Sequence, residues 1–166
     1  MFGIEHCRTD LKDEKPFREQ LCNGRKYDYI YLGAHANTEF FGDSDGMTTM
    51  LWSNLASIFC TTGCLRPGAI LLLGCCRGGL KKVATTLFCS CDQIDYVCGP
   101  RWTVYPADIT AGFHAFLYNM EIRREQPSVA VKRASYATGY DFFCHDRVEM
   151  EDELGLLCDD IPECEP

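Results

Sequence analysis

The stretch from Ala69 to Gly79, Ala-Ile-Leu-Leu-Leu-Gly-Cys-Cys-Arg-Gly-Gly, constrains the fold more than any other part of the chain. Its apolar run follows the turn signal Arg66-Pro67-Gly68, which predicts a strand that is buried on both faces. Two adjacent cysteines separate this strand from a predicted helix. In open α/β sheets, chemistry gathers where strands end at their carboxyl edge, and the dipole of a following helix favours a thiolate there. The stretch is therefore the candidate active centre.

Strands and helices alternate along the chain, which predicts an α/β fold with a mainly parallel central sheet and helices on both faces. Besides the strand from Ala69, the pattern predicts strands over 2–5, 27–35 and 94–98 and helices over 17–21, 47–59, 80–89, 107–125 and 129–137. Residues 36–46 are expected to form a polar loop that lines a substrate site.

The chain has 166 residues, 46% of them hydrophobic, and a formal net charge of −8. We expect a single domain over 1–148 and an acidic tail over 149–166, because the tail holds eight acids and no Lys or Arg. No basic stripe suggests a nucleic-acid partner, and no apolar run is long enough to span a membrane.

Twelve cysteines are spread along the sequence. The first ten residues lack the apolar core of a signal peptide, so we expect a cytoplasmic protein with reduced, buried thiols. The pairs Cys60/Cys64 and Cys89/Cys91 have C-x3-C and C-x-C spacing, and neither forms the repeated C-x2-C knuckle of a structural zinc site. We therefore expect no metal.

His35 ends the predicted strand over 27–35, and Cys75 and Cys76 follow it by 40 and 41 residues at the end of the strand from Ala69. If the two strands are parallel neighbours, these side chains emerge at the same sheet edge, and the imidazole can reach a thiol. A base of this kind would raise the thiolate fraction of the cysteine. We expect the Gly78-Gly79 turn to leave backbone N–H groups free for a developing oxyanion.

The runs Tyr29-Ile-Tyr-Leu-Gly-Ala-His35 and Ile70-Leu-Leu-Leu-Gly-Cys-Cys-Arg-Gly78 resemble the His and Cys blocks of caspase-like (clan CD) cysteine peptidases, most closely the bacterial CHAT type. The similarity covers residues 27–137 and includes Arg101-Trp102 and a long helix that Asp108 opens. The resemblance implies a caspase-like three-layer sandwich. It also implies a cysteine endopeptidase that uses no cofactor.

The resemblance assigns roles to individual residues. Cys76-Arg77-Gly78 matches the family's catalytic block, so Cys76 would be the nucleophile and His35 the general base and acid. The backbone N–H groups of Cys76 and Ala36 would form the oxyanion hole. This sequence has Ala36 where the family usually has glycine, which motivates a second hypothesis. Under that hypothesis the chain is a catalytically inactive relative that acts as a protein-binding module.

The sequence also suggests which residues contact the substrate and which partners the chain has. Relatives that cleave after Arg or Lys often carry an acid two residues before the cysteine, where this chain has Gly74. We expect Asp43 and Asp45 to supply negative charge, and Arg101 and Trp102 to contact the substrate. The expected partners are a protein or peptide substrate and a separate regulatory protein. A third hypothesis is a structural domain stabilised by zinc.

Overall fold

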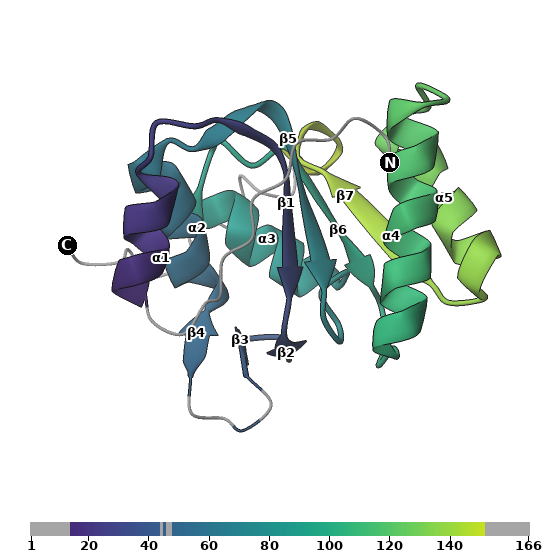
Figure 1. Ribbon diagram of the computed structural model, residues 1–166, viewed down its shortest axis with the longest axis horizontal. Coiled ribbons are helices and arrows are strands. Elements are labelled where there is room, and N and C mark those ends of the chain that lie inside the picture. Colours follow the sequence, from purple (N-terminus) through teal and green to yellow (C-terminus); the bar gives the residue numbers. More distant parts are fainter. Residues whose placement is uncertain (1–13, 44, 46–47, 152–166) are drawn as a thin grey trace.

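The computed structural model describes residues 14–43, 45 and 48–151 (Figure 1). Its helices are α1 (Glu14–Leu21), α2 (Trp52–Thr62), α3 (Lys81–Ser90), α4 (Pro106–Glu121), α5 (Pro127–Thr138) and the short 3-10 helix η1 (Val148–Met150). Its strands are β1 (Tyr27–Gly33), β2 (His35–Ala36), β3 (Phe40–Gly42), β4 (Thr49–Leu51), β5 (Leu65–Gly74), β6 (Tyr96–Pro100) and β7 (Phe142–Asp146).

The central sheet has four strands in the order β1-β5-β6-β7. β1, β5 and β6 are parallel, and β7 pairs with β6 in the antiparallel direction. β5 contains the apolar run predicted as a buried strand, and every residue from Ala69 to Gly74 is buried. The predicted α/β class with a mainly parallel sheet is therefore confirmed.

Helices cover both faces of this sheet (Figure 1). Leu71 and Leu73 of β5 belong to the core that packs against α1, α2 and α3, whereas Ile70 and Leu72 belong to the core under α4 and α5. The alternation follows from the strand's two-residue period, which sends successive side chains to opposite faces. The arrangement is compatible with a three-layer sandwich.

A second, small sheet in the order β2-β3-β4 lies beyond the carboxyl ends of the central strands (Figure 1). The predicted loop over 36–46 is therefore wrong in part, since β2 and β3 form an antiparallel hairpin within it. The helix predicted from Met47 begins instead at Trp52, because β4 precedes it. Phe41 and Trp52 are both fully buried with their rings 4.8 Å apart, and this contact anchors the small sheet to the core.

The C-terminal part of the described chain contains one strand that the pattern did not predict. β7 pairs with β6 over five residues, from Tyr96–Asp146 to Pro100–Phe142. Met150, two residues past the expected domain boundary, is buried in the core shared with α2 and α3. The strand predicted over 2–5 and the tail from residue 152 lie outside the described residues. No helix in the described ranges has the length and apolar character needed to cross a membrane.

Candidate active site

The register of β1 and β5 brings the predicted histidine and cysteine to equivalent places. Gly33, the last residue of β1, pairs with Gly74, the last residue of β5. His35 and Cys76 each lie two residues beyond this pair in sequence, His35 in β2 and Cys76 in the turn after β5. The side chain of His35 is exposed and that of Cys76 is half-buried. The two residues therefore emerge at the same carboxyl edge of the sheet, as the sequence predicted.

The two adjacent cysteines have different surroundings. Cys75 is only 1% exposed, and burial together with the neighbouring Cys76 raises the pKa of its thiol to about 12. Cys75 therefore stays protonated and packed in the core at neutral pH. Cys76, which follows it, is only half-buried.

The loop from Cys75 to Leu80 corrects one expectation about the oxyanion. The N–H of Gly78 donates to the carbonyl of Cys75 (3.2 Å), and the N–H of Gly79 donates to Pro100 (2.9 Å). Both amides are occupied, so the prediction that the Gly78-Gly79 turn leaves them free is wrong. The glycines serve close packing instead, because a Cβ on Gly79 would lie 2.0 Å from the carbonyl oxygen of Gly99.

Two other backbone amides remain suited to an oxyanion. No hydrogen bond within the described ranges engages the N–H of Cys76. The N–H of Asn37 donates to Phe40 (2.9 Å), so Asn37 and Phe40 form a hydrogen-bonded pair of the hairpin. Hydrogen-bonded and non-hydrogen-bonded pairs alternate in antiparallel strands, which directs the N–H of Ala36 away from β3.

Ala36 fits its place without strain. Only Arg77 and Arg124 have positive φ among the described non-glycine residues, so the backbone at Ala36 does not require glycine. Its methyl group packs against the core shared with α2 and α3. Because successive side chains of a strand alternate, the neighbouring His35 points to the opposite side, toward solvent.

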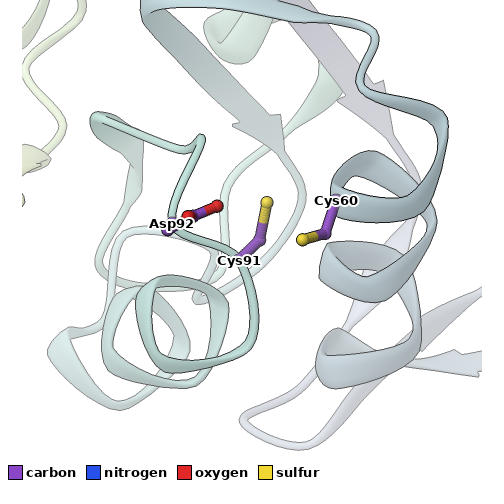
Figure 2. A group of neighbouring side chains, drawn as sticks. All are labelled: Cys60, Cys91 and Asp92. Carbon is purple, nitrogen blue, oxygen red and sulfur yellow. The ribbon is translucent and has the colours of Figure 1, made fainter.

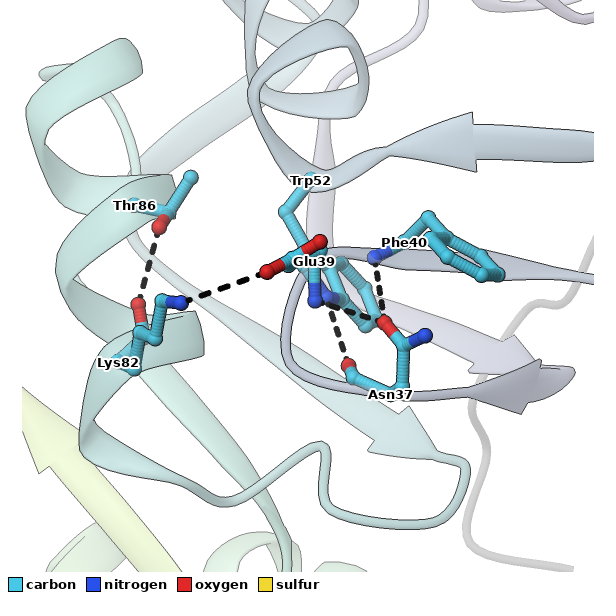
Figure 3. A network of polar contacts seen from close by, with 6 residues as sticks. All are labelled: Asn37, Glu39, Phe40, Trp52, Lys82 and Thr86. Carbon is cyan, nitrogen blue, oxygen red and sulfur yellow. Dashed lines mark hydrogen bonds and ion pairs between the residues drawn. The ribbon is translucent and has the colours of Figure 1, made fainter.

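The hairpin that carries His35 is held in place by polar contacts (Figure 3). Asn37 accepts hydrogen bonds through Oδ1 from the N–H groups of Glu39 and Phe40, which closes a two-residue turn. The indole N–H of Trp52 donates to the carbonyl of Asn37 (3.1 Å).

An exposed ion pair continues this network to the element that follows Cys76. The Lys82 ammonium on α3 lies 3.8 Å from the Glu39 carboxylate, as the dashed line in Figure 3 shows. Both side chains are mostly exposed, so the pair contributes little to stability. It nevertheless joins the turn of the histidine hairpin to the helix behind the cysteine.

The predicted substrate residues fall into two groups. Trp102 accepts the N–H of Arg77 through its carbonyl (3.3 Å), so it adjoins the cysteine loop. The Arg101 guanidinium lies over the rings of Trp102 and Phe143, at 5.0 and 5.5 Å from their centroids. With these contacts Trp102 remains 56% exposed beside the candidate site.

The two predicted acids lie in the connection between β3 and β4. Asp43 follows Gly42, which pairs with His35, so the acid lies next to the histidine hairpin. Its Oδ1 accepts the N–H of Thr48 (3.3 Å), which gives this carboxylate a role in the turn. Asp45 is exposed in the same connection.

Tyr31 is a site residue that the sequence analysis missed. A Cβ on Gly74 would lie 2.5 Å from the Tyr31 hydroxyl oxygen, and one on Gly33 would lie 3.2 Å from the ring. The tyrosine therefore covers the glycine pair just before His35 and Cys76, and its ring packs edge-on against Phe113 at 5.7 Å. Burial and the nearby Cys75 raise the pKa of Tyr31.

Two further residues shape the loop after β5: His145, which contacts it from β7, and Arg77, which lies within it. An imidazole nitrogen of His145 on β7 is 2.9 Å from the carbonyl oxygen of Gly79, a contact across 66 residues that local patterns do not signal. Arg77, directly after Cys76, has φ of 63°, a left-handed conformation that costs a non-glycine residue about 1–2 kcal/mol. Such conformations cluster at functional sites.

The only group of three potential metal ligands among the described residues lies elsewhere, at Cys60, Cys91 and Asp92. Eight of the described cysteines are free thiols, but Cys89 is disulfide-bonded, so the expectation of reduced thiols is wrong at that residue. No protein-family model matches the chain, and no curated protein matches its sequence. The resemblance to caspase-like peptidases therefore rests on the His and Cys blocks themselves.

Proposed function

We propose that the chain is a cysteine endopeptidase with Cys76 as nucleophile and His35 as general base and acid. The observation that carries the proposal is the pairing of Gly33 with Gly74. His35 follows Gly33 by two residues, and Cys76 follows Gly74 by two residues. The burial of Cys75 supports the choice between the adjacent cysteines. A caspase-like sandwich is part of the same proposal.

The reaction proceeds in two stages. His35 takes the thiol proton of Cys76, and the sulfur attacks the carbonyl carbon of the scissile peptide bond. The resulting oxyanion accepts hydrogen bonds from the N–H groups of Cys76 and Ala36. When the C–N bond breaks, the imidazolium gives its proton to the leaving amine and a thioester remains on Cys76.

Hydrolysis of the thioester completes the cycle. His35 takes a proton from water, and the hydroxide attacks the thioester carbonyl. The C–S bond breaks, the carboxylic acid product leaves, and the imidazolium returns its proton to the Cys76 sulfur. No cofactor enters either stage.

The substrate contacts are proposed from exposed rings near the two blocks. Tyr31 covers Gly74 and is 55% exposed, and Trp102 adjoins the loop after Cys76. We propose that these two rings contact the peptide on either side of the scissile bond. Residue 74 is glycine and the Tyr31 ring lies over it, so this position offers no acidic side chain to pair with a substrate Arg or Lys.

Cleavage of a mixed peptide library tests the proposal. Wild-type protein should cleave, whereas Cys76→Ala and His35→Ala should each lose at least about 10³-fold in kcat/KM, and Cys22→Ser should stay within about threefold. Wild type that cleaves no peptide and no intact protein, yet co-purifies with a protein partner, would support the alternative function of an inactive binding module. Equal cleavage by wild type and Cys76→Ala would overturn the proposal.

A further inference from the structure

Three potential metal ligands from two separate elements converge near the ends of α2 and α3 (Figure 2). The sulfur atoms of Cys60 and Cys91 and a carboxylate oxygen of Asp92 all lie within 4.8 Å of one another. Figure 2 shows the three side chains pointing toward a common point, Cys60 from α2 and the other two from the turn after α3. Cys91 is buried, and Cys60 and Asp92 are exposed.

The two elements are fixed to each other by a hydrogen bond beside the cluster. The side-chain amide of Gln93 donates to the carbonyl of Cys60 (3.2 Å), so the turn after α3 is tied to the last turns of α2. This contact fixes the backbone positions from which Cys60 and Cys91 approach each other. The ligand atoms are therefore held in a partly prearranged geometry.

Arg147 supports the same turn from the other side. Its guanidinium donates to the carbonyls of Ile94 (2.7 Å), Phe88 (3.0 Å) and Cys91, and it lies over the Phe88 ring at 4.8 Å. Two thiolates, one carboxylate and a divalent ion carry a net charge of −1. The single positive charge of Arg147 compensates it.

We propose that Cys60, Cys91 and Asp92 bind one divalent ion of the zinc class, with water as the fourth ligand. Zinc prefers tetrahedral sites with thiolate and carboxylate ligands, at about 2.3 Å from sulfur and about 2.0 Å from oxygen, which separates the ligand atoms by about 3.5–3.8 Å. The observed atoms, which lie within 4.8 Å of one another, need to approach by about 1.3 Å at most. On binding, each thiol releases its proton to solvent and forms a metal–sulfur bond in its place.

The sequence concealed this site because it takes one cysteine from each of two closely spaced pairs. Cys60 comes from the C-x3-C pair and Cys91 from the C-x-C pair. An ion there would fasten α2 to the turn after α3, at the end of the sheet opposite to His35 and Cys76. The proposal is therefore independent of the proposed peptidase activity.

Titration of the purified, metal-stripped full chain with Co²⁺ as a spectroscopic substitute for Zn²⁺ tests the site. We expect one ion per chain, a thiolate-to-cobalt charge-transfer band, and displacement of cobalt by Zn²⁺. Removing a direct ligand should cost at least the upper end of the 10–100-fold loss that outer-shell partners cause, so Cys60→Ser should weaken binding at least about 100-fold. Asp92→Asn should weaken binding while the thiolate band remains.

Cys22→Ser, which removes another exposed free thiol, is the matched control and should bind cobalt like wild type. Circular dichroism must show that the variants are folded, and exposed Cys60 makes its serine variant the safer test should the buried Cys91 variant fail to fold. A wild-type chain that binds no cobalt would overturn the proposal. A thiolate band and affinity unchanged in Cys60→Ser would also overturn it, since other cysteines would then be the ligands.

Discussion

Two sites that contain cysteine lie at opposite ends of helices α2 and α3, and the groups around the cysteines differ between them. At the carboxyl end of the sheet, Cys76 has a backbone N–H that no hydrogen bond among the described residues engages, and the histidine hairpin follows the neighbouring strand β1. At the amino end, Cys91 approaches a second sulfur and a carboxylate while an arginine binds its carbonyl. The first environment suits a single reactive thiolate, and the second suits metal ligands. The comparison teaches that neighbouring groups, and not exposure alone, decide the chemistry of a thiol.

The main chain is also held in different ways at the two ends of the sheet. The carboxyl end depends on glycines that allow main chains to touch, as Gly79 and Gly99 do. The amino end has no such approach at Gly68, where a Cβ would meet nothing within 4 Å, and it is held by the side chain of Arg147 instead. Each end therefore has its own sensitivity to substitution.

The largest expected effect separates these two kinds of backbone. Gly79→Ala places a Cβ 2.0 Å from a carbonyl oxygen and should lower the free energy of unfolding by more than about 3 kcal/mol. Gly68→Ala only adopts an unfavourable positive φ of 83° in open space and should cost about 1 kcal/mol. Urea unfolding of both variants measures the difference. Equal losses would show that the close approach at Gly79 is not required.

Alkaline pH should lower the free energy of unfolding through a buried thiol at each end of the sheet. The pKa of Cys75 at one end and that of Cys91 at the other are each raised from 9.0 to about 12, mainly by burial. A raised pKa means that the folded state holds the proton more tightly, so this stability is complete below pH 9 and is lost as the pH rises from 9 to 12. Between pH 8 and 10, the free energy of unfolding of the metal-stripped chain should fall by about 1–3 kcal/mol. Urea midpoints that do not change over that interval would contradict this.

Most of the fold could be predicted from the sequence, because long apolar runs and helical periods dominate it. The helices α3, α4 and α5 lie near where the pattern predicted them, although α4 ends at Glu121 and not at residue 125. β5 contains the predicted run from Ala69 to Gly74, but it begins at Leu65, so the turn predicted over 66–68 is wrong. β2, β3 and β4 were missed because strands of two or three residues are too short to show alternation. β7 was missed because its sequence, Phe-Phe-Cys-His-Asp, is apolar at one end and polar at the other.

The candidate site was predictable only in its backbone positions. His35 and Cys76 could be placed because parallel strands end at one sheet edge. The contacts of Tyr31 with Gly74 and of His145 with Gly79 depend on side-chain packing between distant segments. The approach of Cys60 to Cys91 depends likewise on how α2 packs against α3. No spacing within one motif carries this information.

A smaller effect concerns two arginines, Arg77 directly after Cys76 and Arg124 in the connection between α4 and α5. Arg77 and Arg124 both have left-handed backbones, with φ of 63° and 57°. Replacing either by glycine should change stability by about 1 kcal/mol or less, because relief of the local strain is offset by the greater freedom of glycine in the unfolded chain. Arg77→Val should cost more than Arg77→Gly, since a β-branched residue tolerates positive φ poorly. If thermal unfolding ranked the two Arg77 variants in the reverse order, residue 77 would not have a left-handed backbone.

The smallest expected effect concerns the ion pair between the histidine hairpin and α3. Glu39→Gln removes a pair whose side chains are 67% and 64% exposed, so stability should fall by less than about 0.5 kcal/mol. Thermal unfolding in low and high salt measures this, and salt should erase the difference. A loss above 2 kcal/mol would show that the pair is essential for holding the hairpin.

Site-mapped labelling by a peptidyl electrophile tests the central claim most directly. Mass spectrometry of the digested protein should find the label on Cys76, with none on Cys75, and His35→Ala should label at least about 100-fold more slowly. The exposed thiols of Cys22 and Cys60 serve as internal controls and should react equally slowly in wild type and His35→Ala. Labelling of Cys76 at the rate of Cys22, unchanged in His35→Ala, would contradict the account.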